Sequence, residues 1–241
     1  MDFKLEVPTS LEYFASLVQS DTEFPLLESA ICLAQDEYPE LDIQEVLGQV
    51  DQLVSRLKKR LPADAGSIHK LRVLNKFFFE EMGFAGNANN YYDPDNSYLH
   101  VMLRTRRGIP ISLALLWLEL AGQIGLEAYG VGFPGHFLVK VHLPYPHEGK
   151  VVIDPFNGHS LTKEDLMERL SPLYAESGLA REGDISDELL KHYLRSASPR
   201  EIMTRMLRNL EEVYGSQSDM ERLDAVKKRL KVLLPSLDEA D

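Results

Sequence analysis

An apolar stretch at residues 109–126, followed at once by strand-like segments, constrains the fold of this chain more than any other feature. It reads IPISLALLWLELAGQIGL and is interrupted by Ser112, Glu119 and Gln123. A bilayer span needs about 20 predominantly apolar residues, so the interruptions favour a buried helix. Pro110 suits the first turn of such a helix, where its missing N–H costs nothing. The predicted helix starts at about Pro110, and its core-facing residues are Leu113, Leu116, Trp117, Leu120 and Ile124.

Three segments with the composition of β-strands follow this helix, namely EAYGVGF (127–133), HFLVKVHL (136–143) and KVVIDPF (150–156). The second has the two-residue period of a strand, with Phe137, Val139, Val141 and Leu143 alternating with His136, Leu138, Lys140 and His142. PYPHEG, between the second and third segments, predicts a hairpin loop. Facing residues of the two strands then have numbers that sum to roughly 291–293. We expect an α+β fold in which a helix packs on a small antiparallel sheet.

Helices are predicted on both sides of this unit. On the N-terminal side they cover PLLESAICLA (25–34), a segment from Asp42 as N-cap to residue 61, and a segment from Ser67 to a C-cap at Gly83. On the C-terminal side, residues 198–214 and 219–235 form a helix pair. Spacings in that pair match one tetratricopeptide repeat, and one unit cannot make a solenoid. The predicted division is a helical region at 1–64, a core at 65–182 and a C-terminal helical segment at 183–241.

The charge of the chain is uneven and argues against several classes of partner. The net charge is −12, and residues 1–55 hold twelve Asp or Glu and one Lys. Non-specific nucleic-acid binding needs clustered cations, so we expect no direct nucleic-acid partner. The single cysteine, Cys32, allows no internal disulfide, and the first residues lack the pattern of a signal peptide. We therefore expect a cytoplasmic protein that does not engage a membrane.

His136 and Asp154 are candidates for a catalytic pair. The hairpin register places Asp154 opposite residues 137–139, within a few residues of His136 on the neighbouring strand. A twist or bulge could bring the carboxylate into hydrogen-bonding reach of the imidazole. There it would fix the tautomer of the histidine and stabilise its protonated form, as the acid of a triad does. The alternative is a purely structural pair at the end of a strand.

Ser112 is the candidate nucleophile, because it is the one hydroxyl or thiol in RRGIPISLAL, where the buried helix begins. Free N–H groups and the helix dipole favour developing negative charge at such a place. The alternative is a helix-start serine that bonds the backbone.

No metal or cofactor is predicted. DPDNS in the turn-rich loop at 83–99 resembles a calcium loop but lacks its glycine and terminal glutamate. A site built from His136, His142, His147 and His159 has no regular ligand spacing.

Three motifs give the chain a resemblance to a known family: NYYDPDNS (90–97), RRGIPIS (106–112) and GFPGHFL (132–138), followed by VVIDPFNG (151–158). Together they resemble the bacterial transglutaminase-like family named for the Sir-B invasion-gene regulator, over roughly residues 25–235. Proteins of that family join a transglutaminase-like core to tetratricopeptide-like helices, and the same core occurs in a eukaryotic F-box protein. The resemblance implies a papain-like or transglutaminase-like core.

The resemblance also implies an order of catalytic residues: a nucleophile on a helix, a histidine on a strand and an aspartate on the next strand. His136 and Asp154 match the last two positions. An ungapped overlay puts Pro110 where active relatives have cysteine, and Ser112 takes that place only after a two-residue shift. Ser112 lies about 200° around the helix from position 110, so we expect it to point away from the imidazole.

Two functions follow from these alternatives. The first is a regulatory or protein-interaction module with protein partners, built on a degenerate fold that lacks the catalytic cysteine. The second is a hydrolase or acyltransferase that uses Ser112, His136 and Asp154.

Overall fold

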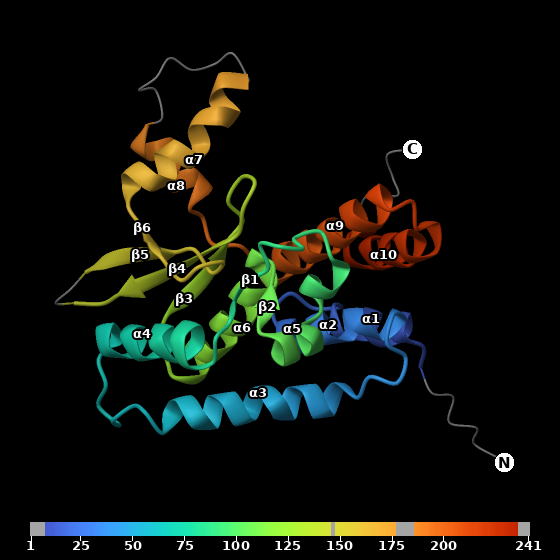
Figure 1. The fold of residues 1–241 in the computed structure, drawn as a ribbon, viewed down its shortest axis with the longest axis horizontal. Helices are drawn as coiled ribbons and strands as arrows, with labels where there is room; N and C mark the ends of the chain where they lie inside the picture. Colours follow the sequence, from blue (N-terminus) through green and yellow to red (C-terminus); the bar gives the residue numbers. More distant parts are fainter. Residues whose placement is uncertain (1–7, 146–147, 177–185, 236–241) are drawn as a thin grey trace.

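The computed structural model describes residues 8–145, 148–176 and 186–235, and in residues 173–176 only the backbone. Helices surround a long central helix, and a small sheet lies on one side of it (Figure 1). The helical elements are α1 (Ser10–Leu17), α2 (Leu26–Cys32), η1 (Leu33–Asp36), α3 (Ile43–Lys58), α4 (Ser67–Asn75), η2 (Lys76–Glu81), η3 (Pro94–Ser97), α5 (Leu99–Thr105), α6 (Pro110–Gln123), α7 (Lys163–Glu176), α8 (Asp187–Tyr193), α9 (Pro199–Ser216) and α10 (Met220–Leu233). The strands are β1 (Ala85–Gly86), β2 (Arg107–Gly108), β3 (Ala128–Val131), β4 (Leu138–Leu143), β5 (Gly149–Ile153) and β6 (Ser160–Leu161).

Local sequence signals set the helix boundaries on the N-terminal side, as predicted. The Asp42 carboxylate accepts a hydrogen bond from the Gln44 N–H at 2.8 Å and caps α3. Helix α4 continues into the π-helical turn η2, and the chain then turns at Gly83, whose φ is +72°. Only glycine adopts that conformation without steric cost.

Helix α6 is the centre of the core and confirms the buried helix that the apolar stretch predicts. Ten of its residues are buried, Ser112 and Trp117 among them. It contacts α3, α4, α5 and α9 on its helical side and β3 and β4 on the other. The indole N–H of Trp117 donates to Asn75 at 3.0 Å, so the polar group of this buried aromatic side chain has a partner.

The larger sheet is antiparallel with the strand order β3-β4-β5-β6, and β1 pairs with β2 in a separate parallel sheet. Val139 faces Ile153, so facing residues of β4 and β5 sum to 292, inside the predicted range. The predicted start of the second strand is wrong, because β4 begins at Leu138 and not at His136. Gly135, with a φ of +67°, makes a turn in which the His136 N–H donates to the Phe133 carbonyl at 3.0 Å. That bond keeps His136 out of the strand ladder.

Both faces of β4 are covered. Val139 and Val141 belong to the main core, whereas Leu138 joins a second cluster with residues of α7 and α8, such as Leu166 and Leu190. Lys140 is also buried on this strand, and its ammonium donates to the Leu194 carbonyl at 2.7 Å. Burial lowers the pKa of Lys140.

The C-terminal residues form the predicted pair of helices, α9 and α10, which lie side by side against α1 and α2 (Figure 1). Apolar residues of the pair are buried against the rest of the chain, namely Met203, Met206, Leu207, Leu210 and Leu230. In the described part of the chain, no helix is long and apolar enough to cross a membrane.

Candidate functional site

His136 and Asp154 form the hydrogen-bonded pair that the hairpin register predicts. Asp154 directly follows β5 and His136 lies two residues before β4, and the two strands are neighbours. The Nε2 atom of His136 is 2.8 Å from Oδ1 of Asp154. The Asp154 side chain is 3% exposed and that of His136 is 21% exposed. The carboxylate is therefore buried, while the imidazole reaches the surface.

Asp154 has two further partners, and one of them is Arg169 of α7. The guanidinium donates to Oδ2 at 2.8 Å, and the Phe156 N–H donates to Oδ1 at 3.0 Å. Burial raises the pKa of Asp154, but the contacts of its carboxylate with His136, Phe156 and Arg169 outweigh burial and hold that pKa below its ordinary value. Asp154 is therefore a carboxylate at neutral pH. Sequence reasoning missed Arg169, because no local motif links it to Asp154.

The orientation of the imidazole leaves one nitrogen for chemistry. Nε2 is bonded to Asp154, while Nδ1 makes no hydrogen bond to any residue that the structure describes. A carboxylate on one ring nitrogen fixes the proton there and leaves the other nitrogen as the base. The bond from Nε2 to the Asp154 carboxylate therefore gives the imidazole of His136 its Nε2–H tautomer. The pair thus consists of a buried carboxylate and an imidazole that the carboxylate orients.

The two-stranded sheet of β1 and β2 connects the loop after Asp154 to the start of α6. The Phe156 carbonyl accepts a hydrogen bond from the Gly86 N–H at 2.7 Å, and Gly86 faces Gly108, two residues before Pro110. Neighbouring strands are about 4.8 Å apart, so about two such spacings separate this loop from Gly108. A Cβ at Gly86 would lie 2.2 Å from the Phe156 ring, so this close approach requires glycine.

Ser112 is bonded to the backbone. It has no exposed surface, and its Oγ donates to the carbonyl of Asn96 at 2.7 Å or of Ile109 at 3.0 Å. The same oxygen accepts from the Ile109 N–H at 3.2 Å. Ser112 and His136 are both within the described residues, and they do not hydrogen-bond each other. The hydroxyl ties the start of α6 to the 83–99 loop, as the helix-start alternative expects.

The predicted absence of a metal site concerns four histidines, of which His147 lies outside the described residues. Among the described residues, no group of three or more His, Cys, Asp or Glu is placed to hold a metal ion. His142 instead pairs with Glu127 at 3.2 Å.

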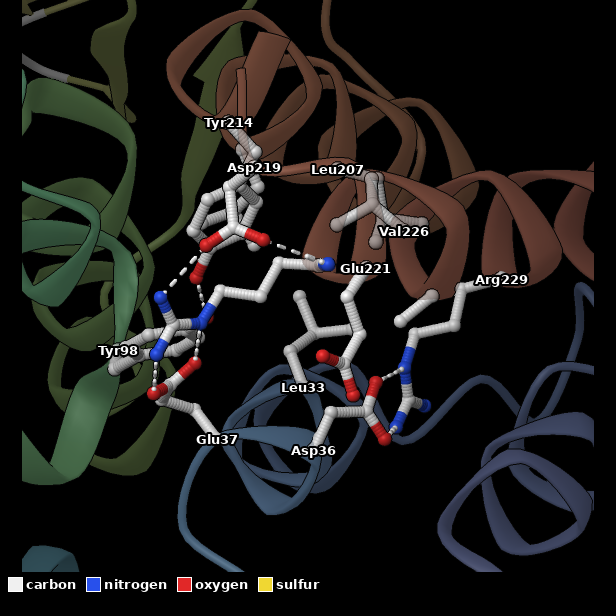
Figure 2. A pocket seen from close by; sticks show the side chains of 13 residues that line it. Leu33, Asp36, Glu37, Tyr98, Leu207, Tyr214, Asp219, Glu221, Val226 and Arg229 are labelled. Atoms are coloured by element: carbon white, nitrogen blue, oxygen red, sulfur yellow. Dashed lines mark hydrogen bonds and ion pairs between the residues drawn. The ribbon is translucent and has the colours of Figure 1, made fainter. Parts of the chain in front are cut away.

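A separate cavity of about 360 Å³ lies between the C-terminal helix pair and η1 (Figure 2). Its polar groups bond one another: Arg222 lies between Glu37 and Asp219, and Arg229 holds Asp36 with two contacts of 2.8 Å. The Tyr98 and Tyr214 hydroxyls, which are 2.6 Å apart, also line this cavity. The contacts of Asp36 and Glu37 join η1 and the residue after it to α10 across the cavity.

Comparison with known proteins assigns the family. The family model described as the transglutaminase-like superfamily matches residues 44–208. This chain belongs to the transglutaminase-like superfamily. A relative in the UPF0162 group, from Xylella fastidiosa strain 9a5c, is 36% identical over 233 residues, which cover 95% of this chain and 79% of the relative. A UPF0162 protein of Pseudomonas aeruginosa is 31% identical over 208 residues, covering 86% of this chain and 71% of that protein.

One relative places the superfamily core in a much longer protein. Human F-box only protein 21 is 29% identical over 148 residues, which are 52% of this chain and 24% of the human protein. No solved structure matches this chain.

Proposed function

We propose that this chain is a protein-interaction or regulatory module built on a transglutaminase-like fold that no longer carries out acyl transfer. The observation that carries the proposal is at the start of α6, where Ser112 is buried and bonded to the backbone. It is supported by the resemblance, whose overlay puts Pro110 in the place of the family's cysteine. The same proposal includes the narrower resemblance to the Sir-B family and the tetratricopeptide-like assignment of the C-terminal helices. It also includes a cytoplasmic location and a division of the chain at residues 64 and 182.

Acyl transfer needs a nucleophile that the base can reach and donors for the oxyanion. A general base acts within about 2.6–3.2 Å of the proton that it removes. Ser112 would have to give up its hydrogen bonds to Asn96 and Ile109 to reach His136, and the loss of buried hydrogen bonds costs free energy. Pro110 has no N–H, so the backbone at the cysteine position cannot donate to an oxyanion. Both deficits lie on α6, whereas the His136–Asp154 pair is intact.

A role in protein contacts is supported by the size of one relative. In F-box only protein 21 the matched region is 24% of the chain, so there the core is one part of a larger protein. The charge of this chain also favours protein partners over direct nucleic-acid or membrane contact, because its excess of acidic residues would repel phosphates.

The alternative function is a hydrolase or acyltransferase that uses Ser112, His136 and Asp154. It is favoured by the Asp154 carboxylate, which orients the imidazole and leaves Nδ1 as a base. Under this alternative the start of α6 would rearrange when substrate binds.

A serine-reactive fluorophosphonate separates the two functions. We expect no label on the wild-type chain and no difference between the wild type and Ser112→Ala, because the hydroxyl is buried. The matched control is Ser216→Ala, a serine at the end of α9. Labelling of the wild type and of Ser216→Ala, together with loss of label in Ser112→Ala, would establish the alternative.

A further inference from the structure

A cavity of about 520 Å³ lies between the loop that carries His136 and one side of α9. Phe133, Pro134 and Phe137 form its apolar wall, and the last two lie within two residues of His136 in the chain. Phe133 is fully buried and Phe137 is 3% exposed, so the wall is held by the core. Pro134, which is half-buried and lies two residues before His136 in the chain, gives this wall accessible apolar surface.

The opposite wall is a polar stripe of α9. Glu201, Thr204, Arg205 and Arg208 line the cavity and recur at the three- and four-residue spacing of one helix face. From Glu201 to Arg208 the helix rises about 10 Å, which matches about three residues of an extended peptide.

The charges of this stripe are only partly neutralised. Arg195, which also lines the cavity, pairs with Glu201 at 2.6 Å, and Arg208 pairs with Glu211 at 2.6 Å. Arg205 is partly buried and makes no hydrogen bond or ion pair with any residue of the described ranges. Burial raises the pKa of Tyr91 in the neighbouring 83–99 loop, and the positive charge of Arg205 opposes that rise. A guanidinium has five N–H donors, so those of Arg205 are available to an anionic group.

We propose that this cavity binds an acidic peptide segment of a protein partner. An aliphatic or aromatic side chain of the peptide packs on Pro134 and Leu234, which line the cavity and are half-buried, and a neighbouring carboxylate pairs with Arg205. The inference rests on the proposed function, because it names the chemistry of the partner. A peptide fits better than a small carboxylate because the stripe is long enough for several residues, and an acidic one fits because Arg205 makes no ion pair with any residue that the structure describes.

The test starts with a random peptide library selected on the immobilised wild-type chain. The dissociation constant of each enriched peptide, labelled with fluorescein, is then measured by fluorescence polarisation. We expect enriched peptides that combine acidic residues with a Leu, Phe or similar side chain. Arg205→Gln should weaken their binding by about tenfold or more, since hydrogen bonds to charged groups are the strong ones. The affinity of Arg205→Lys should lie between those of the wild type and Arg205→Gln, because lysine keeps the positive charge but lacks the forked donor geometry of the guanidinium.

The matched control is Arg104→Gln, which removes an exposed arginine from α5, outside the cavity. It should leave the affinity unchanged. Failure to enrich any peptide, enrichment of basic sequences, or an affinity that Arg205→Gln leaves unchanged would overturn the inference. Self-association that Arg205→Gln abolishes, with no peptide enriched, would assign the cavity to a second copy of the chain and also overturn it.

The inference and the proposed function can fail separately. If the fluorophosphonate labels Ser112 while acidic peptides still bind through Arg205, the module function fails and the cavity stands as a subsite of an enzyme. If no label appears and no acidic peptide binds, the module function stands and this cavity is not its binding site.

Discussion

Replacing Asp154 by asparagine tests the network that holds the His136 loop. The substitution removes the charge that Arg169 and His136 share, and it keeps one oxygen as an acceptor. Net contributions of hydrogen bonds to charged groups are about 1.5–3 kcal/mol each. The Arg169 side chain is 34% exposed and that of His136 is 21% exposed, so water would replace part of what each loses. We expect a loss of about 2 kcal/mol in the free energy of unfolding.

Urea denaturation at neutral pH, analysed by linear extrapolation, measures this loss. The control is Asp51→Asn, an exposed carboxylate on α3, which should leave the free energy of unfolding unchanged. A loss for Asp154→Asn below about 0.5 kcal/mol, which is typical of surface substitutions, would refute the network as a stabilising element.

The same substitution gives a pH dependence with a defined sign. The pKa of Asp154 is lower in the folded chain, so its stabilisation is present above the unfolded pKa of about 3.9 and is lost as the pH falls through the folded pKa. The stability difference between the wild type and Asp154→Asn should therefore shrink below about pH 4. A difference that stays constant down to pH 3, or grows, would contradict the assignment of a carboxylate held ionised by its partners.

Two further predictions concern packing and a buried ion pair. Gly86→Ala should lower the free energy of unfolding by about 1–3 kcal/mol because its Cβ would lie 2.2 Å from the Phe156 ring. Gly122→Ala, on α6, should raise the free energy of unfolding by about 0.5–1 kcal/mol, because its Cβ would have no other atom within 4 Å. If thermal denaturation found Gly86→Ala more stable than Gly122→Ala, the packing would be misassigned. Arg229→Met should lower the free energy of unfolding by about 3 kcal/mol, because Arg229 is 1% exposed and its loss removes the ion-pair partner of Asp36. Adding Asp36→Asn should restore at least half of that loss in urea denaturation, and a double variant that is no better than Arg229→Met would exclude the ion pair as the cause.

Local patterns predicted much of the fold, because they depend on neighbouring residues only. The position of the hairpin loop fixed which residues of β4 and β5 face each other, and this brought His136 and Asp154 together. The polar interruptions of the 109–126 stretch correctly predicted a buried helix instead of a membrane span.

Contacts between distant segments could not be predicted in the same way. Arg169 reaches Asp154 from α7, fifteen residues away, and Arg229 reaches Asp36 over 193 residues. No periodicity encodes either contact. The turn that removes His136 from β4 also depends on the positive φ of Gly135, which the alternation of apolar residues does not report.

The central claim is that position 110 has lost the nucleophile and that Ser112 does not replace it. Cysteine substitution tests both parts in one experiment, since a thiol reports its surroundings through its rate of alkylation. The variants are Pro110→Cys and Ser112→Cys, each with and without His136→Ala, treated with iodoacetamide near neutral pH. The background is low because Cys32 is fully buried, and burial raises its pKa.

The measured quantity is the alkylation rate of each new thiol, obtained by mass spectrometry of the labelled peptide. Positions 110 and 112 are both buried, so the account predicts a difference in their dependence on His136. His136→Ala should slow alkylation of the thiol in Pro110→Cys, because an imidazole beside a thiol favours the thiolate. The account also predicts that His136→Ala leaves the alkylation rate of Ser112→Cys unchanged. A thiol in Ser112→Cys whose rate depends on His136, with no such dependence in Pro110→Cys, would contradict the account.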